Sequence, residues 1–82
     1  MKLFAVCVRD SAADAFHAPL CFPALGMAER WFKDECRSTG DIAKHPSDYE
    51  LYLIGVFDTD TAVFESESRR LLVRGSDTTL NS

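Results

Sequence analysis

Cysteine, glycine and proline are scarce in this 82-residue chain, and none of them forms a recognisable motif. The three cysteines, Cys7, Cys21 and Cys36, are an odd number for a disulfide framework, and they are too widely spaced for a zinc knuckle or a redox pair. The four glycines occur singly, so no glycine-rich phosphate loop is present. The cysteine pattern favours a reducing cytoplasm as the place where the protein is made and used.

The sequence also lacks a catalytic signature. Cys21 with His17, or Cys36 with His45, would supply a nucleophile and a base, and the same residues would supply loosely spaced zinc ligands. Buried structural cysteines and surface histidines explain these residues better, because nothing else in the sequence builds a site around them. We therefore expect no enzyme activity, no catalytic residues, no metal and no cofactor.

Positive charge and long apolar runs are lacking as well. Thirteen acidic residues against nine basic ones give a net charge of -4, which argues against strong sequence-independent nucleic-acid binding but leaves room for a local basic patch. The first apolar run, Leu3 to Val8, is short for a signal peptide and far short of a membrane span. We expect no contact with a membrane.

What the chain does contain is one small domain, residues 1–75, followed by a tail, residues 76–82, that we expect to be disordered. Apolar runs predict strands over Lys2–Arg9, Ala15–Phe22 and Tyr49–Phe57, and Pro19 places the second of these at an edge or a bulge. Residues 58–61 predict a turn, 61–64 a short returning strand, 65–68 a break, and 69–74 a further edge strand. Residues 41–47 predict a loop.

One helix is predicted, over residues 24–38. Leu25, Ala28, Phe32 and Cys36 fall along one apolar stripe at helical spacing, and Gly40 follows the last turn. The order strand, strand, helix, strand, strand and a possible last strand predicts an α+β fold, with an antiparallel sheet of four to five strands and the helix packed on one face. The strand over 49–57 is apolar on both faces, and one helix covers only one, so a second copy of the chain is the simplest cover for the other.

Three sets of side chains are candidate contact surfaces. The first is a basic stripe on one flank of the helix, which either contacts phosphates or is simply a solvated face. The second is a C-terminal cluster of arginines, which either contacts phosphates or protects an edge strand from pairing. Apolar side chains on the helix and the central strand either widen the core or form a dimer or partner interface. The nucleic-acid candidates are Arg30, Lys33, Arg37, Arg69, Arg70 and Arg74, and the interface candidates are Met27, Trp31, Tyr52, Ile54 and Val56.

The most distinctive segment is Lys44–Tyr49, in which Pro46 extends His45 and the following Ser and Asp close a turn. Together with other stretches in order, it resembles the small nonstructural proteins from the fifth open reading frame of gokushovirus-type microviruses, which are single-stranded DNA bacteriophages. The other matching stretches are Met1–Leu3, Asp10–Phe16, Pro19–Phe22, Gly26 with Ala28, Arg30 and Phe32, Gly55–Asp58, Leu71–Leu72 and Arg74–Gly75.

This resemblance implies a protein of the infected bacterial cytoplasm that is absent from the virion and takes part in single-stranded DNA replication or the switch to packaging. It brings no catalytic residues. We expect a homodimer that binds single-stranded DNA or the phage replication or packaging proteins. The alternative is an interaction module that binds a host or phage protein without touching DNA.

Overall fold

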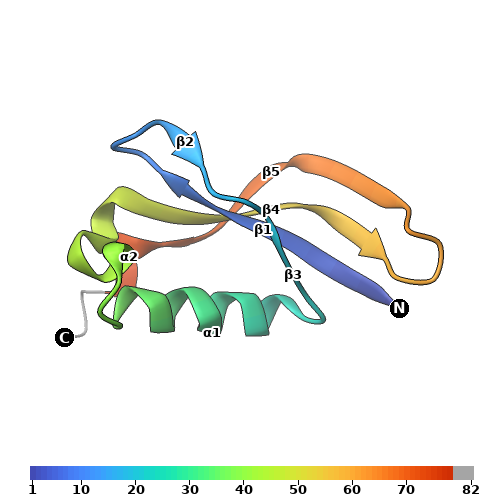
Figure 1. Ribbon diagram of the computed structural model, residues 1–82, viewed down its shortest axis with the longest axis horizontal. Coiled ribbons are helices and arrows are strands. Elements are labelled where there is room, and N and C mark those ends of the chain that lie inside the picture. The colour runs from blue at the N-terminus through green and yellow to red at the C-terminus, as the bar shows by residue number, and fades with distance from the viewer. Residues whose placement is uncertain (79–82) are drawn as a thin grey trace.

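The structure, a computed structural model, describes residues 1–78 and has an α+β fold, as predicted. Five strands form one antiparallel sheet, and one long helix lies on it (Figure 1). In chain order the elements are β1 (Lys2–Asp10), β2 (Ala15–Phe16), β3 (Leu20–Phe22), α1 (Leu25–Cys36), α2 (Asp41–Lys44), η1 (Pro46–Asp48), β4 (Tyr49–Asp58), β5 (Phe64–Arg74) and α3 (Gly75–Thr78).

The sheet is built on β1 and β4, which pair along nearly their whole lengths. Its order is β2-β1-β4-β5, and β3 pairs with β1 on the same side as β2. The predicted strand over 15–22 is therefore an edge segment split in two around Pro19, which cannot donate a ladder hydrogen bond. The edge position predicted from that proline is confirmed.

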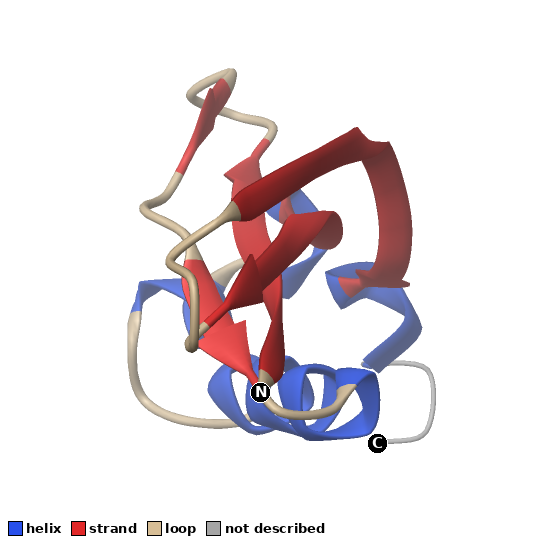
Figure 2. Ribbon diagram, turned by 90° about the vertical axis from the view of Figure 1, so that its right-hand side faces the viewer, coloured by secondary structure: helices blue, strands red, loops and turns tan. Residues whose placement is uncertain are grey.

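The predicted helix is confirmed as α1, and its apolar stripe faces the sheet. Ala28, Phe32 and Cys36 are buried, and they pack with Val6, Val8, Leu51, Leu53 and Val73 of the strands in one core. At the C-terminal end, the Arg37 backbone N–H donates to the Asp34 carbonyl oxygen, and the Ser38 backbone N–H donates to that of Glu35. Figure 2 shows α1 along one side of the strands, with β5 bending away above it.

A bulge in β4 corrects the predicted faces of the central strand. Successive residues Ala5 and Val6 pair with Gly55 and Leu53, so Ile54 is an extra residue in the ladder. Beyond it Val56 pairs with Phe4, whose side chain packs on the core under α1. The prediction that Val56 shares a face with Tyr52 is wrong, because the bulge exchanges the two faces from that point on.

The second half of the chain also differs from prediction. The polar run over 65–68 is not a break, because β5 continues through it and pairs with β4 on both sides. The expected loop over 41–47 contains the short helices α2 and η1, and the chain forms α3 where a fraying end was predicted. Gly75 and Thr78 of α3 are buried, and α3 packs against η1 and β4. Residues 79–82 of the predicted tail lie outside the described residues.

Candidate functional site

The face of the sheet opposite α1 carries a cluster of two aromatic rings and one arginine. Tyr52 pairs with Cys7, and Phe16 pairs with Arg9 at the neighbouring edge, so both rings project to this face. Their centroids are 5.9 Å apart in an edge-to-face arrangement. The Arg69 guanidinium lies over both rings, with its carbon 5.0 Å from the centroid of Phe16 and 5.3 Å from that of Tyr52. We call Phe16, Tyr52 and Arg69 the Arg69 cluster.

Arg69 reaches this position through an irregularity in β5. Between the pairs Gly55–Ser66 and Leu53–Arg70, β5 has three residues where β4 has one, which locally bends the strand and redirects its side chains. Below the cluster, burial raises the pKa of the Cys7 thiol, and the positive charge of Arg69 acts in the opposite direction. Arg69 is therefore close to the centre of the sheet although it is exposed to solvent.

The arginines next to this cluster are paired with carboxylates. Glu50 lies 3.6 Å from Arg9 and 3.7 Å from Arg74, and Arg9 also donates to Asp14 over 3.0 Å. Within residues 1–78, Arg69 has no carboxylate within 4.0 Å. In this part of the chain its guanidinium lies over the two rings, whose faces attract cations through their quadrupoles.

The three C-terminal arginines do not form one patch. Arg70 pairs with the core residue Leu53, so it lies on the α1 side of the sheet, opposite to Arg69. Arg74 is held by Glu50, as described above. Arg74 lies on the aromatic face because it pairs with Glu50, but of these three arginines only Arg69 has its guanidinium over the two rings.

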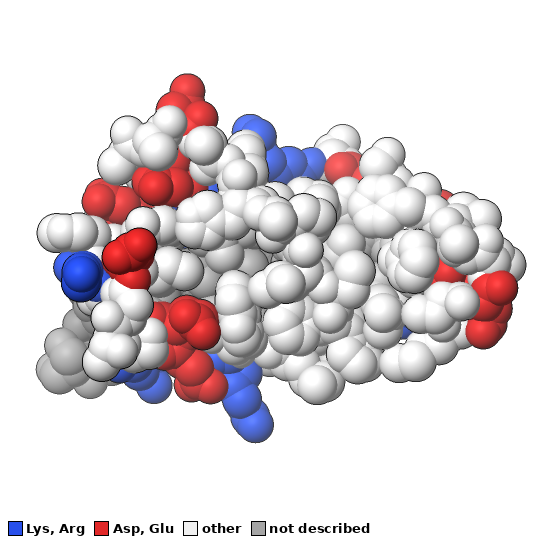
Figure 3. Space-filling model, in the orientation of Figure 1, with Lys and Arg blue, Asp and Glu red and all other residues white. Residues whose placement is uncertain are grey.

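The basic flank of α1 does come together as predicted. Arg30, Lys33 and Arg37 line a shallow groove of about 470 Å³, but Glu29 and Asp34 line the same groove. Figure 3 shows basic and acidic side chains interspersed around the helix rather than one basic surface. Alternating charge of this kind is typical of a solvated helix face.

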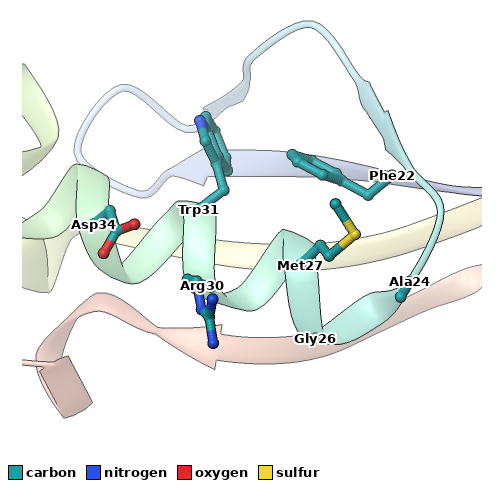
Figure 4. Close-up of a pocket in the computed structure, with 7 residues that line it drawn as sticks. All are labelled: Phe22, Ala24, Gly26, Met27, Arg30, Trp31 and Asp34. Carbon is teal, nitrogen blue, oxygen red and sulfur yellow. The ribbon is translucent and has the colours of Figure 1, made fainter.

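A second, mainly apolar groove of about 570 Å³ lies between β3 and α1. Phe22 and Trp31 form its wall, with ring centroids 5.8 Å apart, and the side chain of Met27 is exposed at its centre (Figure 4). We call it the Trp31 groove. Its lining residues are Phe22, Ala24, Gly26, Met27, Arg30, Trp31 and Asp34.

The structure thus joins Met27 to Trp31, as the sequence predicted, but separates them from Tyr52, which lies on the other side of the sheet. Sequence reasoning missed Phe16 and Phe22, which contribute a ring to the Arg69 cluster and to the Trp31 groove respectively. Both are exposed or half-exposed aromatics in short edge strands next to Pro19, and that combination was the available signal.

The cysteines and histidines lie apart. Cys7 and Cys36 are buried and Cys21 is exposed, while His17 packs edge-on against Tyr49 at 5.9 Å. Among residues 1–78 no three side chains of the metal-binding types gather into a group. In the same part of the chain, no helix has both the length and the apolar character needed to cross a membrane.

Comparison with known protein families gives a match that covers nearly the whole chain. The model of the phage ORF5 protein family matches residues 1–78, and the resemblance noted from the sequence is confirmed. No curated protein and no solved structure matches the chain. The chain therefore belongs to the phage ORF5 protein family and is a bacteriophage accessory protein.

Proposed function

We propose that this accessory protein acts in phage single-stranded DNA replication, or in the switch to packaging, by binding single-stranded DNA through the Arg69 cluster. The observation that carries the proposal is an exposed arginine that has no carboxylate partner among residues 1–78 and lies over two aromatic rings on the sheet face opposite the helix. The protein acts in the host bacterial cytoplasm, outside the virion, and performs no catalysis of its own.

An aromatic ring and an arginine are the two elements that proteins combine to hold single strands. Unpaired bases stack on aromatic faces whatever their identity, and arginine contributes both a phosphate contact and a planar surface for stacking. Phe16 is 40% exposed, so a base can reach its ring from solvent. A base that takes the position of the guanidinium on Phe16 leaves Arg69 free to contact the adjacent phosphate.

The net charge of -4 sets the strength of this binding. Arg69 supplies one phosphate contact, and the neighbouring Arg9 and Arg74 contribute only when they leave Glu50. Affinity therefore falls in the range of non-specific nucleic-acid binding, with a Kd on the order of 10 µM at physiological salt. Such weak binding suits a protein that coats or passes along a strand rather than one that reads a sequence.

A titration of a fluorescent oligothymidylate of about twelve nucleotides, followed by anisotropy at several salt concentrations, tests the proposal. We expect binding at low salt, and a plot of log K against log salt with a slope of about -0.7 to -1.4, which corresponds to one or two phosphates on a single strand. A duplex of the same length should bind more weakly, because its bases are already stacked and paired. No binding at the lowest salt, or equal binding of the duplex, would contradict the proposal.

A further inference from the structure

The Trp31 groove has no part in the proposed DNA contact, since α1 and the Arg69 cluster lie on opposite sides of the sheet. Met27 is 53% exposed, and Leu20 of the adjoining β3 is 44% exposed. Figure 3 shows mostly uncharged side chains over β3 and the first turn of α1, with charged groups further along the helix. A surface of exposed apolar side chains beside a charged border is typical of a protein contact site.

The charges in the groove indicate which partner it takes. Arg30 and Asp34 are one helical turn apart and both line the groove, in the same stripe as Met27 and Trp31 (Figure 4). Neither of them forms an ion pair within the described chain, residues 1–78. The groove thus presents one cation and one anion of its own, neither of which has an ion-pair partner in the part of the chain that the structure describes.

A second copy of the chain, related by a two-fold axis, supplies the opposite charge that each of these two side chains needs. In an isologous interface residue i of one protomer meets residue j of the other, and j meets i in turn. Two antiparallel copies of α1 place Arg30 near Asp34 of the partner subunit twice, and Trp31 of each copy then lies between the two pairs, close to the two-fold axis. We propose that the Trp31 groove is the interface of a two-fold homodimer of this chain, closed by two reciprocal pairs between Arg30 and the partner's Asp34.

The edge of the sheet next to the groove extends this interface. β3 pairs with β1 on one side, and its other side has no strand partner within residues 1–78. A stable dimer buries about 800 Å² on each partner, which is about 15% of the 5185 Å² of accessible surface of this chain. The helix stripe together with Leu20–Phe22 of β3 provides a continuous area for that contact. Dimerisation through this side leaves the Arg69 cluster of both protomers open.

Charge reversal tests the proposal by light scattering or analytical ultracentrifugation over a range of protein concentrations. The wild type should show a particle of twice the 9.2 kDa chain mass. In R30E or D34R, each reciprocal pair becomes a like-charge contact, so the dimer Kd should rise on the order of a hundredfold, about tenfold for each pair. The double variant R30E/D34R restores both pairs and should dimerise as the wild type does.

An equimolar mixture of R30E and D34R provides a second rescue. Every contact in the mixed dimer again joins opposite charges, so heterodimers should form from two chains that are each monomeric alone.

K33E is the matched control, because Lys33 lies on the same helix but does not line the Trp31 groove, and it should dimerise normally. Circular dichroism checks that each variant is folded.

The outcomes separate clearly. The proposal is overturned if the wild type stays at 9.2 kDa at about 100 µM and above. That result is expected of a chain whose groove binds only a foreign protein. The proposal also fails if the single variants dimerise like the wild type. It fails as well if they lose dimerisation and neither the double variant nor the mixture restores it. Because the DNA titration uses a different surface, failure of one proposal leaves the other standing.

Discussion

Phe32→Ala is expected to remove a large part of the stability of the fold. Phe32 is fully buried between α1 and the sheet and is among the largest side chains without solvent exposure. Truncation of a buried phenylalanine costs about 3–5 kcal/mol, through lost transfer free energy and the cavity that remains. An 82-residue domain has a total free energy of unfolding of about 4–12 kcal/mol. The variant should therefore lose at least about a quarter of the free energy of unfolding of the wild type.

Urea denaturation followed by circular dichroism measures this effect. Lys33→Ala, at the next position of the same helix, is the control, since Lys33 is exposed and alanine is the better helix former; its midpoint should change little. The account of the core fails if Phe32→Ala lowers the free energy of unfolding by less than about 1 kcal/mol.

Arg69→Ala is expected to produce the largest loss of single-stranded DNA binding of any single substitution of a charged residue. The change removes the phosphate contact and the planar group beside Phe16 and Tyr52 together. Affinity for the oligonucleotide should fall by at least about tenfold, and the salt slope should become shallower by about 0.7 for the lost phosphate. The affinity of Arg69→Lys should lie between those of the wild type and Arg69→Ala, because lysine keeps the charge but cannot stack as a planar group.

Arg70→Ala is the matched control for this result. It removes the same charge from the adjacent residue, but Arg70 lies on the α1 side of the sheet, so affinity should change by less than about threefold. Phe16→Ala removes stacking without a change in charge and should lower affinity by about 1–3 kcal/mol without altering the salt slope. Equal losses for Arg69→Ala and Arg70→Ala would indicate that only net charge matters, and the proposed site would be wrong.

The helix was predictable from the sequence because its signal is local. The apolar residues Leu25, Ala28, Phe32 and Cys36 recur at helical spacing among charged ones. This pattern involves only residues of the helix itself, so it can be read without knowing the rest of the fold. The edge position of the segment around Pro19 was predictable for a similar reason, since the missing N–H is a property of one residue.

The course of β5 could not be read in the same way. Its residues 65–68 alternate glutamate and serine, a composition typical of a break, yet they belong to a strand because an edge strand needs only one paired side and its side chains are solvated. β5 is a strand because it pairs with β4, and the composition of residues 65–68 gives no sign of that pairing. The bulge at Ile54 is equally hidden, and it reversed the predicted face of Val56.

The Arg69 cluster depends on these same non-local features. It joins residues from β2, β4 and β5, and Arg69 reaches the other two only through the irregular pairing of β5. Close contact between these strands also needs Gly55, where a Cβ atom would lie 2.5 Å from the Glu65 carbonyl oxygen and from the Phe64 ring. The sequence indicated that arginines near the C-terminus were candidates, but not which of them meets the aromatic face.

Mapping of single-stranded DNA onto the protein by NMR tests the central claim most directly. In ¹⁵N-labelled protein titrated with the oligothymidylate, the largest amide shift changes should occur at Cys7, Phe16, Tyr52 and Arg69, on the sheet face opposite α1. The amides of Arg30, Lys33 and Arg37 should change little. Shift changes concentrated on that helix flank, or none at all at a saturating oligonucleotide concentration, would contradict the assignment of DNA binding to the Arg69 cluster.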